Sequence, residues 1–234
     1  MSVIADAFSH EPPPGFRGLQ PDKPIHFYVR HLPHWRQEDA TYFVTFRLGD
    51  ALPPEELHAL RELRENWERK HPHPRTEQDW EDYARIVTQR AENCLDKGYG
   101  ACHFFNKELA DQLMKSMLHY QDTRCFVPCL TVMPNHAHLI IKPFPGFELE
   151  DTLGLIKGFV ARHVNLKNGS SGALWEQESY DRIIRDVQHL QRVIQYIGNN
   201  GSKAGLPVEK YRRWIHPDWD FGPWKFETCA SAAP

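Results

Sequence analysis

Two histidines placed two residues apart are the strongest chemical signal in this chain. His136 and His138 lie within the apolar, β-favouring run of residues 132–141. Because side chains alternate between the two faces of a strand, both imidazoles are expected to project from the same side of a sheet. Two neutral imidazoles so placed can bind a divalent cation, although such a pair also occurs incidentally in a chain with 14 histidines.

A polar stripe near the end of the sequence supplies partners for this pair. Residues 187–200 have the spacing of an amphipathic helix, and Tyr196 and Asn200 lie one turn apart on its polar side. The Asn200 carbonyl oxygen can complete a set of metal ligands, and the Tyr196 hydroxyl can attack phosphorus once it is deprotonated. An unperturbed phenol has a pKa of about 10, so this chemistry needs a group that stabilises the phenolate or accepts its proton.

The elements expected to position these residues follow the order of a ferredoxin-like fold. Strands are predicted at 42–48, 125–133, 136–142 and 179–185, and helices at 106–120, 148–166 and 187–200. Apart from a helical insertion expected at about 53–99, the order is strand, helix, strand, strand, helix, strand, helix. The sequence therefore predicts an α+β fold: a split βαβ antiparallel sheet with helices on one face, plus the insertion and a C-terminal helix that carries Tyr196.

The predicted domain organisation is one main domain with two flanking segments. Residues 1–25 read as an extended arm, residues 26–206 form the main domain, and residues 207–234 form a tail. The insertion is expected to be a helical pair packed on the main domain, because no Gly/Ser linker isolates it. The tail mixes aromatic and basic residues, which suits either stacking on unpaired bases or covering of the core, and covering is favoured.

Composition limits the classes of protein that fit. The 234 residues include 41% hydrophobic and 25% charged side chains, as in a folded globular protein. No apolar run is long enough to cross a bilayer and no signal-peptide pattern opens the sequence, so a cytoplasmic protein without a membrane partner is expected. Five cysteines without paired zinc-ligand spacing indicate neither a disulfide framework nor a structural zinc site. A net charge of -3 means that any DNA site must be local.

Several spaced segments resemble one family of DNA-processing enzymes. They are MPNHAHL (133–139), IKGF (156–159), WEQESYD (175–181), YIGNN (196–200) and KAGL (203–206). In this order, from about residue 31 to residue 206, they resemble the REP-associated tyrosine transposases. These belong to the single-tyrosine, IS200-like branch of the HUH nucleases.

The resemblance implies a reaction, a cofactor and a partner. By this resemblance, His136, His138 and Asn200 are metal ligands for Mg²⁺ or Mn²⁺, and Tyr196 is the nucleophile. The family cleaves single-stranded DNA beside a palindromic hairpin, forms a 5′-phosphotyrosine and rejoins strands by the reverse step. The expected partner is therefore single-stranded hairpin DNA, and a monomer is favoured over a dimer.

Residues around these motifs are candidate DNA contacts, because cationic and polar groups can follow a phosphate backbone even in an acidic chain. They are Asn135, Lys157, Arg162, Arg182, Arg185, Arg192 and Lys203. Two positions depart from the family pattern. Ala137 is smaller than the usual residue between the histidines, with little expected effect. Gly201 replaces the usual proline after the asparagine, which is expected to loosen the end of the helix that carries Asn200.

Three alternatives stay open at this point. Tyr180 is a rival nucleophile, although it lies in a predicted strand without an Asn or Gln one helical turn away. A domesticated hairpin-binding protein that has lost turnover would bind DNA without a covalent adduct. A two-histidine hydrolase that uses metal-bound water would need further ligands, which the sequence does not reveal.

Overall fold

The computed structural model describes residues 10–227 and contains a five-stranded and a two-stranded sheet. The larger sheet has the order β6-β3-β5-β4-β7, and each neighbouring pair is antiparallel. Its strands are β3 (Tyr42–Arg47), β4 (Cys125–Val132), β5 (His136–Pro143), β6 (Tyr180–Ile183) and β7 (Arg212–Ile215). Because β6 pairs with β3 and β5 lies between β3 and β4, the predicted ferredoxin-like fold class is confirmed.

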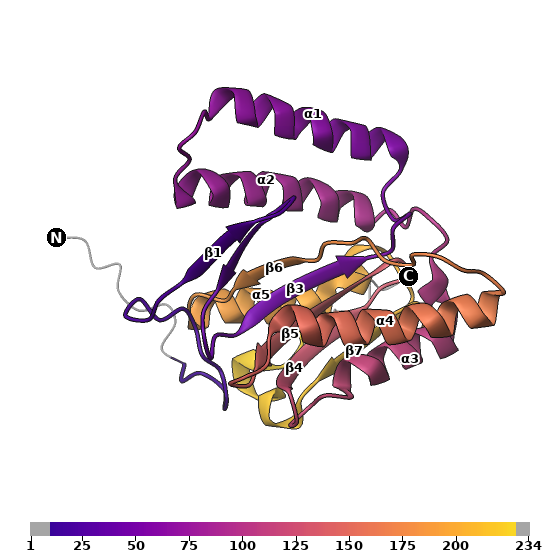
Figure 1. The fold of residues 1–234 in the computed structure, drawn as a ribbon. Coiled ribbons are helices and arrows are strands. Elements are labelled where there is room, and N and C mark those ends of the chain that lie inside the picture. Colours follow the sequence, from indigo (N-terminus) through magenta and orange to yellow (C-terminus); the bar gives the residue numbers. More distant parts are fainter. Residues whose placement is uncertain (1–9, 228–234) are drawn as a thin grey trace.

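Helices cover both faces of this sheet (Figure 1). Helices α3 (Lys107–Leu118) and α4 (Leu149–Asn168) pack on one face, and α5 (Val187–Lys203) packs on the other. The Asn106 side chain caps α3, and the Asp186 side chain caps α5 by accepting from the His189 backbone nitrogen. Both helices therefore begin where the sequence predicted.

Alternation along β5 divides its side chains between two cores. Ala137, Leu139 and Ile141 lie in the core beneath α3 and α4, whereas Ile140 lies in the core beneath α5. The two histidines share the parity of Ile140, so they face α5. The prediction that both imidazoles project from one face of the sheet is thus confirmed, and the face is the one that α5 covers.

The helical insertion lies above the main sheet in Figure 1, next to the two-stranded sheet. It consists of α1 (Pro54–Lys70) and α2 (Glu77–Leu95), and the small sheet consists of β1 (His26–Val29) and β2 (Pro33–Arg36). An aromatic core joins helices to strands; it includes Trp67, Trp80, Tyr83, Phe27 and Trp35. Short aromatic strands of this kind depend on the helices for burial, which explains why the sequence did not reveal them.

Residues 207–227 join the main fold. β7 adds a fifth strand beside β4, and Trp219 and Trp224 are buried in the core beneath α5. The Trp219 indole nitrogen donates to the Pro14 carbonyl oxygen at 2.8 Å, so this segment also meets the N-terminal arm. Of the two roles that the sequence left open for the tail, the buried tryptophans match core covering.

No helix within residues 10–227 combines the length and apolar character needed to cross a bilayer. The four cysteines of this range are buried and free. Cys229 lies outside the described residues.

A buried ionic network ties β2 to β6 and α4. The two ring nitrogens of His34 lie 2.7 Å from carboxylate oxygens of Asp181 and Glu178. Arg36 pairs with Asp181 and with Glu150. Burial opposes the charged imidazole, but the hydrogen bonds to Asp181 and Glu178 outweigh it and raise the pKa of His34 to about 9.

Replacing this histidine tests the network. The charged form of His34 stabilises the fold below its unfolded pKa of about 6.5, and this contribution is lost as the pH rises through about 9. We expect His34→Gln to lower the free energy of unfolding at pH 6 by up to about 3 kcal/mol. The decline in stability between pH 6.5 and 9 should also be weaker in the variant. Urea unfolding at pH 6, 7.5 and 9 measures both, and equal pH slopes would contradict the charged state.

Candidate active site

Strand β5 and helix α5 bring four of the predicted site residues together. The Tyr196 hydroxyl lies 3.4 Å from His138 Nε2, and the ring centroids of His136 and His138 are 4.7 Å apart. His136, His138 and Asn200 are each at most 1% exposed. Helix α5 reaches the histidines because its apolar stripe packs on the same face of the sheet; the stripe is Leu190, Val193, Ile194 and Ile197.

The two imidazoles are oriented through their Nδ1 atoms. Asn135 Oδ1 lies 2.8 Å from His136 Nδ1, and Thr45 Oγ1 lies 2.7 Å from His138 Nδ1. The Asn135 amide nitrogen donates to the Tyr99 carbonyl oxygen at 3.0 Å, so Oδ1 is the acceptor towards His136. His136 Nδ1 therefore carries the proton, and Nε2 is left with a free lone pair.

Three atoms beside the histidines are buried without a hydrogen-bond partner in the described part of the chain. They are His136 Nε2, Asn200 Oδ1 and Asn200 Nδ2. An unpaired buried polar atom costs about 1–3 kcal/mol, so a ligand that pairs with these atoms would offset that cost. Imidazole nitrogens and an amide oxygen suit a divalent cation, and these residues fit the ligand set implied by the resemblance.

This ligand set is unlike the commoner ones. No group of three or more His, Cys, Asp or Glu side chains within residues 10–227 is arranged to hold a metal. The candidate site does not form such a group because its third potential ligand is the amide of Asn200, which is none of these four residue types. A site with one amide and two neutral imidazoles brings no negative charge of its own to a cation or to a phosphate.

Burial keeps both histidines neutral. It lowers the pKa of His136 to about 3, and the neighbouring Asn200 partly offsets this effect. Burial also places the pKa of His138 well below its ordinary value, and His136 and Lys203 lower it further. Because the neutral imidazole is the form that binds a metal, both side chains are ready to act as ligands near neutral pH.

Tyr196 stands between the buried histidines and side chains from the helical insertion. Burial raises the pKa of Tyr196, the carboxylates of Glu92 and Asp96 raise it further, and Arg182 opposes them. Asp96 Oδ2 in turn lies 3.3 Å from Lys203 Nζ. The phenol is therefore protonated in this arrangement, and attack on phosphorus requires an acceptor for its proton.

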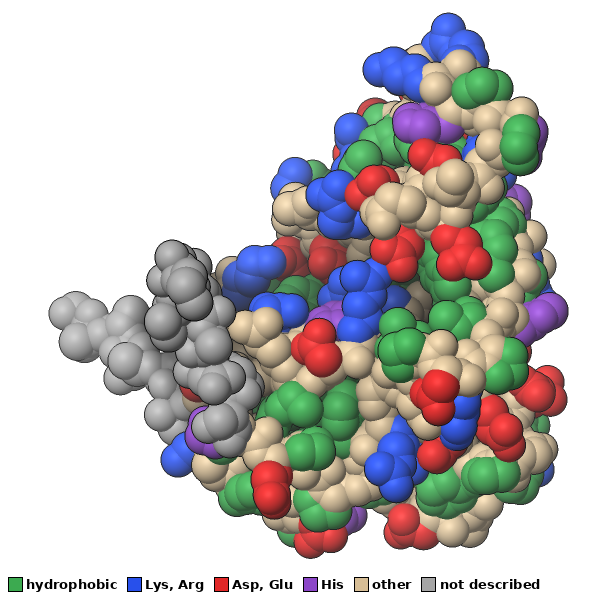
Figure 2. Space-filling model, turned by 90° about the vertical axis from the view of Figure 1, so that its left-hand side faces the viewer, with side chains coloured by type: hydrophobic (Ala, Val, Ile, Leu, Met, Phe, Trp, Pro, Cys, Tyr) green, Lys and Arg blue, Asp and Glu red, His purple; other side chains and the backbone are tan. Residues whose placement is uncertain are grey.

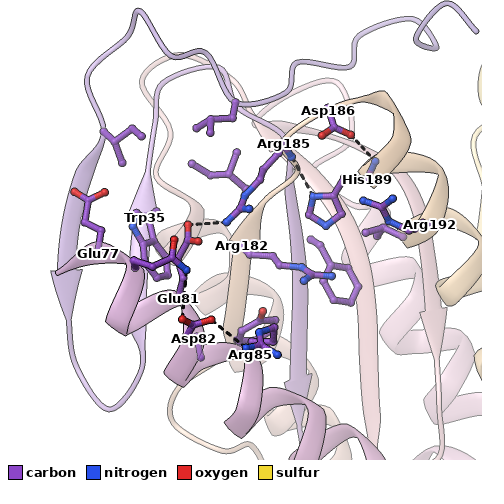
Figure 3. A pocket seen from close by; sticks show the side chains of 18 of the residues that line it. Trp35, Glu77, Glu81, Asp82, Arg85, Arg182, Arg185, Asp186, His189 and Arg192 are labelled. Atoms are coloured by element: carbon purple, nitrogen blue, oxygen red, sulfur yellow. Dashed lines mark hydrogen bonds and ion pairs between the residues drawn. The ribbon is translucent and has the colours of Figure 1, made fainter. Parts of the chain in front are cut away.

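A cleft of about 800 Å³ opens between α2 and the start of α5, and Tyr196 is part of its lining. Figure 2 shows the molecule hollowed beneath its projecting upper part, with Lys and Arg side chains gathered at the hollow. In Figure 3, Arg182 of β6, Arg185 of the loop that follows it and Arg192 of α5 approach this space, opposite α2. Arg185 forms an ion pair across the cleft with Glu81 of α2, with 2.6 Å between Nη2 and Oε1.

Comparison with known proteins gives a family match for the middle of the chain. Residues 101–200 match the family described as "Transposase IS200 like". The chain resembles IS200-like transposases over this segment. The segment runs from η1 (His103–Phe105) into α5, and it includes both histidines, Tyr196 and Asn200. The resemblance to the IS200-like branch that the sequence motifs indicate is therefore confirmed over residues 101–200.

One solved structure is described as a REP-associated tyrosine transposase bound to a REP hairpin. It is 15% identical to this chain, with a TM-score of 0.36, and the alignment covers 77% of this chain and 74% of that one. No curated protein matches the chain. The fold assignment rests on the strand order and register of this chain itself.

Three of the residues predicted to contact DNA lie away from the cleft. Asn135 is 1% exposed, and its side-chain oxygen accepts a hydrogen bond from His136 Nδ1. The Lys157 ammonium donates to the Glu176 carbonyl oxygen at 2.9 Å and fastens the loop before β6. Arg162 is exposed on α4, which covers the opposite face of the sheet from α5. The other four predicted contacts line the cleft or lie beside Tyr196: Arg182, Arg185, Arg192 and Lys203.

The rival nucleophile Tyr180 lies on β6, opposite Thr45 in the ladder, and also lines the cleft. Burial raises its pKa, as it does for Tyr196. The hydroxyl in contact with His138 is nevertheless that of Tyr196. Geometry therefore favours Tyr196 over Tyr180.

The expectation that Gly201 loosens the end of α5 is wrong. The IS200-like pattern would place a proline here, but α5 continues through Gly201 to Lys203, and Asn200 is fully buried. The ring of Tyr211 occupies the space that a side chain at position 201 would need. Glycine is thus used for close packing and not as a flexible helix end.

Sequence reasoning missed four residues that shape the site. Asn135 was assigned to DNA, and Thr45, Glu92 and Asp96 were not singled out. Glu92 and Asp96 are spaced four apart at the end of a predicted helix, which places them on one face but does not say what that face meets. Only the packing of the insertion on the main domain brings them to Tyr196.

The role of Asn135 in orienting His136 can be tested by two substitutions. Asn135→Ala removes the acceptor for the Nδ1 proton, and we expect Mn²⁺ affinity to fall about 10–100-fold. Asn135→Asp keeps an acceptor there but turns a carboxylate towards the Tyr99 carbonyl oxygen, so it should lose thermal stability while retaining most of the affinity. Mn²⁺ titration by EPR and metal-free melting curves separate the two effects. Similar metal affinity in both variants would refute this role.

Proposed function

We propose that this chain is a metal-dependent, tyrosine-based endonuclease and strand transferase that acts on single-stranded DNA beside hairpin-forming repeats. The observation that supports this proposal is that Tyr196 contacts His138 and Asn200 neighbours His136 in one site, where His136 Nε2 and Asn200 Oδ1 are buried without partners in the described part of the chain. The IS200-like match over residues 101–200 supports the same class of reaction.

His136 Nε2, His138 Nε2 and Asn200 Oδ1 are the atoms that would hold Mg²⁺ or Mn²⁺. When bound, the cation polarises a phosphate oxygen and offsets the charge that develops at phosphorus. Asn135 and Thr45 contact the Nδ1 atoms, so the Nε2 atoms are the ones available as ligands: that of His136 has no partner in the described part of the chain, and that of His138 contacts the Tyr196 hydroxyl. The protein thus fixes the direction of its ligands before the metal or the DNA arrives.

Tyr196 is the proposed nucleophile. Its hydroxyl oxygen forms a bond to phosphorus while the bond to the 3′ oxygen breaks, which leaves a 5′-phosphotyrosine; the departing oxygen takes a proton from solvent. Glu92 accepts the phenolic proton, because it lies beside the hydroxyl, whereas the Asp96 carboxylate is paired with Lys203. Reversal of these transfers rejoins the strands, and one phosphodiester replaces another without an external energy source.

The cleft is the proposed path of the DNA strand. Arg182, Arg185 and Arg192 provide local positive charge in a chain whose net charge is -3. Phosphates on this wall would bring the strand along β6 and α5 towards Tyr196, which lines the same cleft. Lys203, which lies 5.8 Å from the centre of the Tyr196 ring, adds a cation next to the nucleophile.

Covalent capture tests the nucleophile. With Mn²⁺ and a single-stranded hairpin oligonucleotide, the wild-type protein should form a denaturation-resistant adduct. We expect Tyr196→Phe to abolish the adduct while keeping hairpin affinity, because only the attacking oxygen is lost, and Tyr180→Phe to retain it. Denaturing gels and fluorescence anisotropy provide the two measurements.

Each other outcome of this assay would indicate a different nucleophile or a different activity. Loss of the adduct in Tyr180→Phe but not in Tyr196→Phe would make Tyr180 the nucleophile. Hairpin binding without any adduct in the wild type would indicate a binding protein that has lost turnover. Cleaved DNA without attached protein would indicate hydrolysis by metal-bound water.

The proton acceptor is tested separately. Glu92→Gln is expected to slow adduct formation at saturating DNA by about 10²-fold or more, because the phenol loses its base. Affinity for the hairpin should be unchanged or higher, since a negative charge is removed. Glu77→Gln makes the same charge change on α2 within the cleft and is the matched control. A Glu92→Gln variant as fast as this control would exclude Glu92 as the acceptor.

A further inference from the structure

Two glycines lie on the helix that carries Tyr196 and Asn200, on sides that these two residues do not occupy. Successive residues of a helix are rotated by about 100°, so Gly198 lies on roughly the opposite side of α5 from Tyr196 and Asn200, and Gly201 lies about 100° from Asn200 and about 140° from Tyr196. Both glycines are buried. Glycine is among the least favourable residues in a helix interior, so its use at two buried interior positions indicates a need for close packing.

Aromatic rings occupy the space that side chains at these positions would need. A Cβ atom at Gly198 would lie 2.4 Å from Phe226 Cδ1, and one at Gly201 would lie 2.4 Å from Tyr211 Cδ1. These distances are far inside van der Waals contact, so a side chain at either position must displace the ring or the helix. Both rings come from residues 211–226, hereafter the C-terminal segment.

The C-terminal segment is anchored to the helix and to the sheet. Its strand β7 pairs with β4, and Arg213 donates to the Gly198 carbonyl oxygen at 2.9 Å while its guanidinium lies 5.2 Å from the centre of the Phe226 ring. Gln195 of α5 donates to the Lys225 carbonyl oxygen at 2.9 Å. The rings therefore contact α5 from a fixed position on the main sheet.

We propose that the C-terminal segment sets how closely α5 approaches the histidines, with Gly201 and Tyr211 as positioning residues for the reaction. Asn200 directly precedes Gly201, and the ring of Tyr211 contacts α5 on a different side from the one that carries Tyr196 and Asn200. A shift of the helix by a fraction of an ångström at Gly201 therefore changes the place of Asn200 and Tyr196 relative to His136 and His138. This inference rests on the proposed function for its catalytic readout.

Gly201→Ala tests the proposal, because helix propensity and positioning predict opposite results. Propensity alone predicts a helix that is at least as stable and a site that is unchanged. Positioning predicts weaker Mn²⁺ binding and, at saturating hairpin DNA, adduct formation slower by about 10²-fold, since small misplacements of reacting groups have effects of this size. Affinity for the hairpin should stay within about threefold of the wild type, because the arginine wall of the cleft is untouched.

A matched control separates this effect from that of any helical alanine. Gly154 lies within α4 and has no heavy atom within 4 Å of the place where its Cβ would stand. Gly154→Ala is therefore expected to keep wild-type metal affinity and adduct rate.

Removing the opposing ring provides a rescue. Tyr211→Ala makes room for the added methyl group, so the double variant Gly201→Ala/Tyr211→Ala should form the adduct at least tenfold faster than Gly201→Ala alone. A defect that arose only from poor folding would be worse in the double variant, since it also loses a buried ring. Recovery of the rate together with Mn²⁺ affinity supports positioning.

The results separate this inference from the proposed function. A wild-type protein that binds no Mn²⁺ and forms no adduct would overturn the proposed function. If the wild-type protein binds Mn²⁺ and forms the adduct, two results would overturn the positioning role alone. One is a Gly201→Ala variant that behaves like the wild type, and the other is a double variant slower than Gly201→Ala.

Discussion

The candidate site depends on the register of β5 between two cores. Ala137 and Leu139 belong to the core beneath α3 and α4, while His136 and His138 face α5. A slip of one residue would place both imidazoles in the other core and expose the apolar residues to α5. The pairing of Thr45 with His138 across β3 and β5 holds this register and at the same time provides a hydrogen bond to the imidazole. Fold specificity and ligand orientation thus come from the same strand pair.

The cost of burying charged groups explains why the residues of the candidate site are uncharged. His136, His138 and Asn200 are uncharged, so burying them has a lower cost than burying carboxylates, yet His136 Nε2 and both Asn200 side-chain atoms lack partners within residues 10–227. A cation would satisfy His136 Nε2 and Asn200 Oδ1, and the anionic phosphate would balance its charge. Tyr196 closes this space on the side of the cleft. In the proposed function, a phosphate that moves from the cleft to the histidines therefore passes Tyr196 first.

Local sequence signals predicted what is locally determined. The alternation of residues 136–141, the caps at Asn106 and Asp186 and the spacing of Tyr196 and Asn200 each follow from short-range rules, and the structure agrees with them. Contacts between distant elements could not be predicted in this way. Glu92 reaches Tyr196 only through the packing of the insertion. The sequence predicts a weak helix end at Gly201, because it does not show that the ring of Tyr211, ten residues further on, packs against this glycine. Neither contact can be predicted from the local sequence, because each joins residues of two different elements.

The insertion gives the cleft two walls of opposite charge. Arg185 and Lys203, on the side of α5, each pair with a carboxylate from the α2 side, Glu81 at 2.6 Å and Asp96 at 3.3 Å. Both cations are more than half exposed, and exposed ion pairs contribute only about 0–1 kcal/mol. A phosphate can therefore replace Glu81 as the partner of Arg185 at little cost, whereas the Asp96 carboxylate is only 16% exposed and depends more on Lys203. In the proposed function, the acidic wall would also repel the backbone of a DNA strand, so its phosphates would favour the arginine side while its bases face α2. A chain with a net charge of -3 could then hold a strand in one orientation, because its small positive surface lies beside Tyr196.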